Sequence, residues 1–119
     1  MEVNQKFPKA EKLKRQSQIK TLFTEGKVLR HYPIKLVFST LEEKPTKVGV
    51  SVSKRSFKKA VDRNRIKRQI REAYRLHKTI LNDTKHSYAI MFIYLSREKT
   101  EFAVIQSAIK HLLDKLQNS

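Results

Sequence analysis

The sequence predicts a single α+β domain in which helices cover a small sheet. Two segments in which apolar and polar residues alternate, 34–40 and 47–53, have the two-residue period of strands. A nearly continuous apolar run, 88–95, is typical of a strand that is covered on both faces. Two longer segments, 60–81 and 100–116, repeat apolar residues at helical spacing, so each predicts a helix with one apolar side.

Cap and turn residues place the elements at the start of the chain. The polar, basic residues 1–15 are expected to form a loosely ordered arm. Ser17 is expected to cap a short helix whose apolar residues recur at i, i+3 and i+4, and Gly26 is expected to end that helix in the left-handed conformation. A brief extended piece, 28–31, completes the prediction for this part of the chain.

The two alternating strands are separated only by the turn 42–46, and we expect them to pair with each other in antiparallel orientation. A basic connector, 54–59, leads from the second strand into the long helix. Thr100 is expected to be the N-cap of the last helix.

The net charge of the chain restricts the possible functions more than its length does. The 119 residues suit one domain, 1–119, and they carry 27 Lys and Arg against 11 Asp and Glu, a net charge of +16. The positive charges repel one another and destabilise the folded state, so we expect a polyanionic partner. Nucleic acid is the first candidate and an anionic membrane the second. The absence of cysteine excludes disulfides and thiolate metal sites. With no apolar run of membrane-spanning length and no secretory leader, we expect a soluble protein of the cytoplasm.

The basic residues of the long helix lie on one side of it. Eleven Lys or Arg and only two acids occur between Lys54 and Lys78, and like charges stand four residues apart, an arrangement that weakens an isolated helix. Arginine predominates, and its planar fork suits phosphate oxygens. We therefore expect this face to contact nucleic acid. RNA is favoured over DNA because the helix follows a strand rather than the short helix of a helix-turn-helix unit. Binding to a membrane is disfavoured because the apolar side of the helix lacks Trp and other large aromatic residues.

Nothing in the sequence indicates that the protein catalyses a reaction unaided. The four histidines are scattered, and the carboxylates lack the spacing of a metal site, so we predict no catalytic residue and no metal ligand in the chain. Asp62 is expected to be an acid at the start of the long helix, and His77 to pack on its apolar side.

The motif Arg63-Asn64-Arg65-Ile66-Lys67-Arg68 with Arg71, preceded by the strand sequence 48–54, is similar to that of the bacterial ribonuclease P protein family, and the resemblance covers nearly the whole chain. It implies an αβββαβα order with a left-handed βαβ crossover, like domain 2 of ribosomal protein S5. It also implies that the protein binds the catalytic RNA of ribonuclease P and helps it to remove the 5′ leader of precursor tRNA. The hydrolysis would belong to the RNA and its Mg²⁺, with no obligate protein partner.

The resemblance also implies site residues. The predicted RNA-binding set, which combines the motif with the neighbouring cations, is Arg63, Asn64, Arg65, Lys67, Arg68, Arg71, Arg75, Lys54 and Arg55. The predicted leader-binding cleft lies between the first helix and the sheet and is formed by Phe23, Ile19 and Val37. Ile19 departs from the family pattern, which often has an aromatic residue there. The alternatives are a structural RNA-binding protein of the ribosomal type without a processing role and, more distantly, a DNA-binding regulator.

Overall fold

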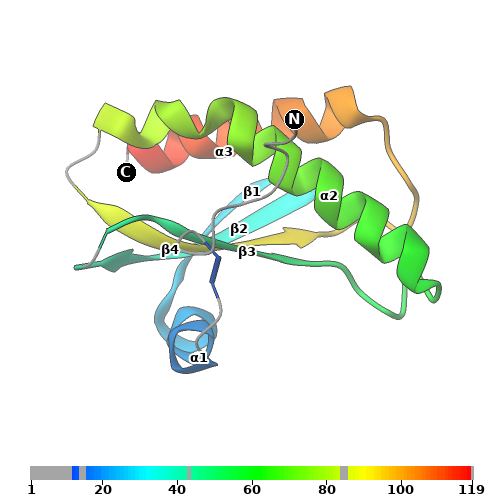
Figure 1. The fold of residues 1–119 in the computed structure, drawn as a ribbon, viewed down its shortest axis with the longest axis horizontal. Coiled ribbons are helices and arrows are strands. Elements are labelled where there is room, and N and C mark those ends of the chain that lie inside the picture. Colours follow the sequence, from blue (N-terminus) through cyan, green and yellow to red (C-terminus); the bar gives the residue numbers. More distant parts are fainter. Residues whose placement is uncertain (1–11, 14–15, 43, 84–85, 119) are drawn as a thin grey trace, which may run out of the picture.

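A computed structural model describes residues 12–13, 16–42, 44–83 and 86–118. Within these residues, three α-helices, one 3-10 helix (η2) and four strands follow one another (Figure 1). Their bounds are α1 Gln16–Glu25, β1 Lys27–His31, β2 Ile34–Leu41, β3 Lys47–Ser51, α2 Ala60–His77, η2 Lys78–Asp83, β4 Ser87–Tyr94 and α3 Phe102–Gln117.

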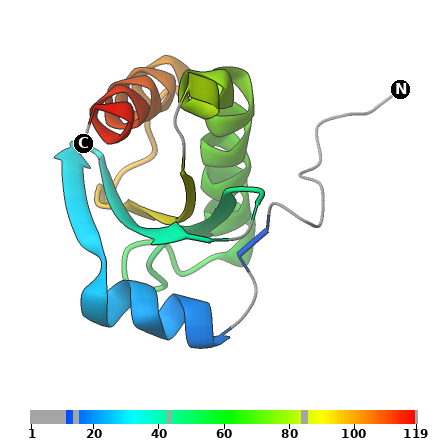
Figure 2. The same cartoon turned by 90° about the vertical axis from the view of Figure 1, so that its left-hand side faces the viewer.

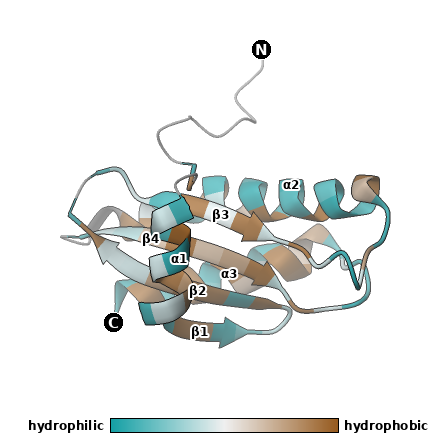
Figure 3. Ribbon diagram, turned by 90° about the horizontal axis from the view of Figure 1, so that it is seen from below, coloured by the Kyte–Doolittle hydropathy of each residue, from teal (hydrophilic) through white to brown (hydrophobic). Residues whose placement is uncertain are grey.

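The four strands form one sheet in the order β1-β2-β4-β3. The strand β4 pairs with β2 in antiparallel and with β3 in parallel orientation. The predicted antiparallel pair of 34–40 with 47–53 is therefore wrong, because β4 lies between β2 and β3. Alternation identifies a strand but not its partner, and the almost wholly apolar β4 takes the most covered position in the sheet. The connection from β3 through α2 to β4 is a left-handed crossover, which can be followed in Figures 1 and 3.

The sheet is the middle layer of the molecule. The helices α2 and α3 cover one face and α1 crosses the other (Figure 2). The larger apolar cluster lies under α2 and α3 and includes Phe38, Ile70, Phe92, Ile109 and Leu112. The smaller cluster lies under α1 and consists of Leu13, Leu22, Val37, Ala89 and Met91, with Ile19, Leu41 and Ile93 partly buried against it.

Both ends of α1 differ from the prediction. Ser17 lies inside the helix, which begins at Gln16, so Ser17 is not its cap. Gly26 does not have a positive φ angle. Its N–H donates to the carbonyl of Leu22 at 2.9 Å, and a Cβ at Gly26 would overlap that carbonyl and lie 2.8 Å from Cγ1 of Val37. Glycine is needed here because the Leu22 carbonyl and the Val37 side chain leave no room for a Cβ, and not because the backbone is left-handed.

The end of α2 and the start of α3 also differ from the predicted positions. The α-helical part of the long helix ends at His77, and the chain continues as η2, which still buries Leu81. The N-cap of α3 is Glu101 instead of Thr100. The hydroxyl of Thr100 lies 3.1 Å from that of Tyr94, so it is engaged with β4 rather than with the helix.

Part of the predicted arm is held by the sheet. Lys12 forms a parallel bridge with Val48 of β3, where the N–H of Leu13 donates to the Val48 carbonyl at 3.1 Å, and Leu13 is buried. Residues 1–11 and 14–15 of this prediction lie outside the described residues. Among the helices that the structure describes, none has the length and apolar character needed to cross a membrane.

Candidate nucleic-acid interface

The helix α2 is oriented by its apolar side. Ile66, Ile70, Ala73 and Tyr74 are buried, and the Tyr74 ring lies 6.0 Å from that of Phe92 in β4. This packing turns the basic side of α2 away from the core, and the helix appears mostly hydrophilic in Figure 3. His77 is only partly buried, and its Nε2 atom has no hydrogen-bond partner within the described parts of the chain.

The predicted residues of this face are mostly accessible. Asn64, Arg65, Arg68 and Arg71 are exposed, and Lys67 is half-buried. Within the described ranges, none of the four cations among these five residues has a carboxylate within 4.0 Å. Folding therefore leaves their charges available to an external anion. Together we call these five residues the α2 cationic face.

Arg63 differs from its neighbours because its guanidinium is used inside the protein. Nη1 donates to the carbonyl oxygens of Phe57 at 2.8 Å and Lys58 at 2.9 Å. Phe57 is buried with its ring 5.9 Å from that of Tyr94, so Arg63 fastens the connector 54–59 to the start of α2. The sequence prediction treated every cation of the motif alike and missed this role.

The connector carries the two other predicted cations, Lys54 and Arg55, and both are exposed. Its fold is held by two hydrogen bonds to Ser53: the N–H of Phe57 donates to the Ser53 carbonyl at 3.0 Å, and the N–H of Arg55 donates to Oγ of Ser53 at 3.0 Å. Lys54 and Arg55 thus lie in a locally bonded connector that precedes α2 in the chain.

Two ion pairs modify the ends of the interface. Arg75 donates to both carboxylate oxygens of Glu72, at 2.6 and 2.8 Å. This bond lowers the pKa of Glu72 and raises that of Arg75, so the charge of Arg75 is largely compensated within α2. At the other end, Nζ of Lys99 lies 2.9 Å from Asp62 and its hydrogen bond lowers the pKa of that carboxyl. Asp62 lies in the first turn of α2 as predicted, but its partner Lys99 was not foreseen.

The predicted cleft residues separate into two environments. Phe23 is 55% exposed and Ile19 is half-buried, and the two lie four residues apart on one flank of α1. Val37 is only 4% exposed because α1 covers it, so it lies beneath the helix and forms no open wall. The half-buried Ile93, which the sequence analysis missed, lies in β4 with its side chain against the same small cluster.

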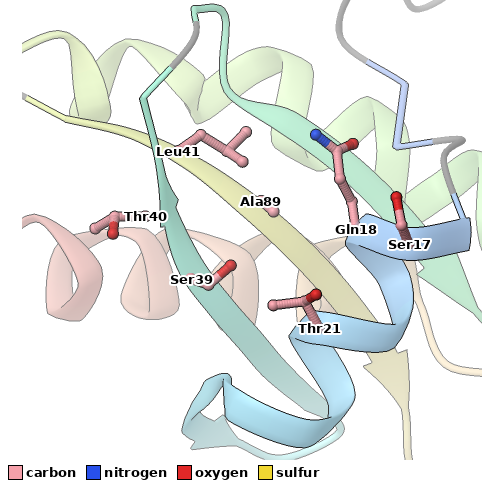
Figure 4. A pocket seen from close by; sticks show the side chains of 7 residues that line it. All are labelled: Ser17, Gln18, Thr21, Ser39, Thr40, Leu41 and Ala89. Carbon is pink, nitrogen blue, oxygen red and sulfur yellow. The ribbon is translucent and has the colours of Figure 1, made fainter.

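The opposite flank of α1 borders a separate hollow of about 180 Å³ (Figure 4). Its lining is uncharged and consists of Ser17, Gln18, Thr21, Ser39, Thr40, Leu41 and Ala89. Oε1 of Gln18 is buried and has no partner within the described residues. In the same part of the chain, no three His, Asp or Glu residues are grouped as metal ligands would be.

Comparison with known proteins gives consistent matches along the chain. The family model for ribonuclease P matches residues 7–117. A ribonuclease P protein component of Porphyromonas gingivalis is 38% identical over 115 residues, which cover 91% of this chain and 84% of the relative. The corresponding protein of a Picosynechococcus species is 35% identical over 109 residues, 90% of each chain.

Solved structures have the same fold. The RNase P protein of Staphylococcus aureus superposes with a TM-score of 0.75 at 25% identity, over 92% of this chain and 97% of that one. The RNase P protein of Thermotoga maritima superposes with a TM-score of 0.75 at 24% identity, over 88% of this chain and 96% of that one. The arrangement of one sheet between α1 and the α2–α3 layer is thus shared with both.

Proposed function

Because the chain belongs to the ribonuclease P protein family, and is thus the protein subunit of a ribonucleoprotein endoribonuclease, we propose that α2 binds the catalytic RNA and that the accessible surface formed by Phe23, Ile19 and Ile93, which we call the groove beside α1, binds precursor tRNA. In this proposal the protein contributes binding energy, and the RNA with its Mg²⁺ performs the hydrolysis of the leader. The alternative of a ribosomal-type protein without a processing role is not favoured by the relatives.

The observation that carries the proposal is the α2 cationic face. Its cations stand on a rigid helix whose opposite side is buried, and folding provides no carboxylate within 4.0 Å of any of them in the described residues. A preformed row of this kind binds phosphates without reorganising, and each contact that releases a counterion lowers the affinity as salt rises. Lys54 and Arg55 would extend this row along the connector.

The groove beside α1 supports binding of a single-stranded leader. Phe23 is a large aromatic side chain that remains more than half exposed although apolar residues of its own helix are buried. Proteins that bind single strands use such rings as stacking platforms, each worth about 1–3 kcal/mol per base. Ile19 and Ile93 would provide the apolar surface beside the ring.

One experiment tests the two contacts separately. The protein is added to ribonuclease P RNA with precursor tRNA that has or lacks a leader, and cleavage and substrate affinity are measured at low Mg²⁺. We expect the protein to raise the affinity for the leader-bearing substrate alone. Phe23→Leu should lose this gain and Phe23→Tyr should keep it, since only the second retains a stacking ring. If the protein changes neither cleavage nor affinity, the proposal is wrong.

The α2 contact has its own readout. Arg68→Ala and Arg71→Ala should each weaken assembly with the catalytic RNA and lower the slope of log affinity against log salt by roughly 0.7–0.9. The exposed Lys110 of α3 lies on another helix, and Lys110→Ala is the matched control. An equal loss in all three variants would show that only the net charge matters. DNA should compete weakly with the catalytic RNA, and strong duplex-DNA binding would favour the DNA-binding alternative instead.

A further inference from the structure

We propose that Arg30 of β1 and Lys35 of β2 form a phosphate-binding pair at the β1–β2 end of the groove beside α1. The ligand would be the phosphodiester backbone of the single-stranded leader. The inference rests on the proposed leader groove and adds to it a contact that the family motif does not include.

Strand register places the two side chains together. Arg30 is paired directly with Lys35, Lys35 with Ile93, and Ile93 with Ser51 of β3, so the four residues form one row across the sheet. Directly paired residues have their side chains on the same face of a sheet.

The row lies on the face that α1 crosses. The next row on that face contains Val28, Val37 and Met91, and the last two are buried with Leu22 of α1. The intervening residues of β1 face the other way, since Leu29 packs in the larger cluster. The helix does not cover the outer part of the row: Arg30 is exposed and Lys35 half-buried.

Two cations in direct cross-strand register repel each other, and the described residues place no negative charge beside this pair. None of the four strands contains an aspartate or a glutamate, and neither side chain has a carboxylate within 4.0 Å in the described part of the chain. An anion between Arg30 and Lys35 would turn an unfavourable pair into a favourable one.

The surroundings indicate which kind of anion. Val28, in the row next to Arg30 and Lys35, is 45% exposed, and two residues along a strand separate neighbouring rows by about 7 Å. Phe23 lies two residues before the end of α1, and the helix joins β1 through Gly26. An exposed ring and a cationic pair at one end of a groove match the arrangement by which proteins hold a single strand, with bases on the ring and backbone on the charges.

The position favours the leader over the catalytic RNA. The α2 cationic face belongs to the helical layer on the opposite side of the sheet (Figure 2), and β1 is the edge strand most distant in the sheet from β3. An RNA bound along α2 would have to pass around the molecule to reach Arg30. A strand lying in the groove beside α1 reaches it directly.

The test uses the reconstituted holoenzyme with three charge-neutral variants: Arg30→Gln, Lys35→Gln and Lys27→Gln. Lys27 is the matched control, because it lies on the same strand as Arg30 but is paired with Phe38 and so is on the other face. Affinity is measured for leader-bearing and leaderless precursor tRNA. We expect Arg30→Gln and Lys35→Gln each to weaken binding of the leader-bearing substrate about threefold to tenfold, with a salt slope reduced by roughly 0.7. Binding of the leaderless substrate should not change.

A second measurement identifies the phosphate. A single neutral methylphosphonate is moved through the leader, and one position should weaken binding by wild-type holoenzyme but not by the Arg30→Gln holoenzyme. Thermal denaturation should show that Arg30→Gln and Lys35→Gln are at least as stable as the wild type, since each removes a repulsion.

The outcomes separate this inference from the proposed function. If Arg30→Gln and Lys35→Gln behave like Lys27→Gln while Phe23→Leu still weakens leader binding, the phosphate pair is refuted and the groove stands. If leader-bearing and leaderless substrates lose affinity equally, or the affinity for the catalytic RNA falls, the pair contacts the catalytic RNA and the inference is wrong. If Phe23→Leu also has no effect, the leader groove itself is refuted.

Discussion

Replacing Arg63 with methionine would separate the structural part of the arginine motif from its RNA-binding part. Methionine retains the apolar stem of the side chain but removes both hydrogen bonds to the connector. The bond to Phe57 is partly buried and involves a charged donor, so its loss should cost about 1.5 kcal/mol. The bond to Lys58 is exposed and should add only about 0.5 kcal/mol. The expected loss of unfolding free energy is therefore about 2 kcal/mol.

For a chain of 119 residues, the unfolding entropy makes each kcal/mol worth about 4 °C, so the melting temperature should fall by about 8 °C. Calorimetry or urea denaturation measures the stability, and hydrogen exchange at the Phe57 amide, which is bonded to Ser53, reports the loosening of the connector directly. Arg65→Met is the control. Its side chain is exposed, so stability should change by less than about 0.5 kcal/mol while RNA affinity and its salt slope fall.

The opposite pattern would refute this reasoning. If Arg63→Met is as stable as the wild type, its connector amides exchange at the normal rate, and its RNA affinity falls with a reduced salt slope, then Arg63 is a phosphate contact like its neighbours. Arg63→Lys offers a further comparison, since it keeps the charge but has a different donor geometry.

Three further perturbations test other parts of the structure. Gly26→Ala should lower the free energy of unfolding, measured by urea denaturation, by at least about 2–3 kcal/mol. Gly49→Ala, whose Cβ would approach the flexible end of Met91 and lie at ordinary contact distance from Leu13, should cost less than about 1 kcal/mol; equal losses would contradict this. Lys59→Ser should supply the side-chain cap that α2 lacks, raising the free energy of unfolding by about 1 kcal/mol while weakening RNA binding. Glu101→Ser should stabilise α3 by a similar amount and leave RNA binding unchanged. Burial, helped by neighbouring positive groups, lowers the pKa of His31 from 6.5, so its unfolded form takes up a proton more readily than its folded form. Stability should be complete above pH 6.5 and fall as pH drops toward the folded pKa, and His31→Gln should flatten that part of a thermal-denaturation profile.

The periodicity of the sequence predicted the helices and strands correctly but not which strands pair in the sheet. The two alternating segments and the apolar run are strands, and both long amphipathic segments are helices. The error was to pair the two alternating strands with each other. Alternation reports which side chains are covered, and it contains no information on which strand lies beside which. The central position of β4 follows from a crossover that only the resemblance implied.

Local hydrogen bonds explain why the ends of elements were misplaced. A serine near the start of a helix, or a glycine after it, has several ways to satisfy the backbone, and the surrounding packing selects one. Gly26 illustrates this, since the nearness of Val37 requires a glycine at a position where φ is not positive.

The candidate site was foreseen as a set of cations but not as a set of roles. Helical spacing correctly placed the basic residues opposite the buried side of α2. It could not show that Arg63 bonds to the connector or that Arg75 bonds to Glu72, because those contacts depend on rotamers and on a loop. The sequence could have indicated that Lys35 belongs to the candidate site, because Lys35 lies two residues from Val37 and therefore on the same face of the strand.

The central position of β4 has a consequence for how the protein is made. Until β4, which ends at Tyr94, has been synthesised, β2 and β3 have no strand between them, and the buried side of α2 lacks Phe92, against which its Tyr74 packs. A chain that ends between α2 and β4 therefore contains the whole arginine motif but lacks the strand against which α2 packs. Translation must pass beyond the motif before the motif becomes usable, and prematurely terminated products should be poor competitors for the RNA subunit.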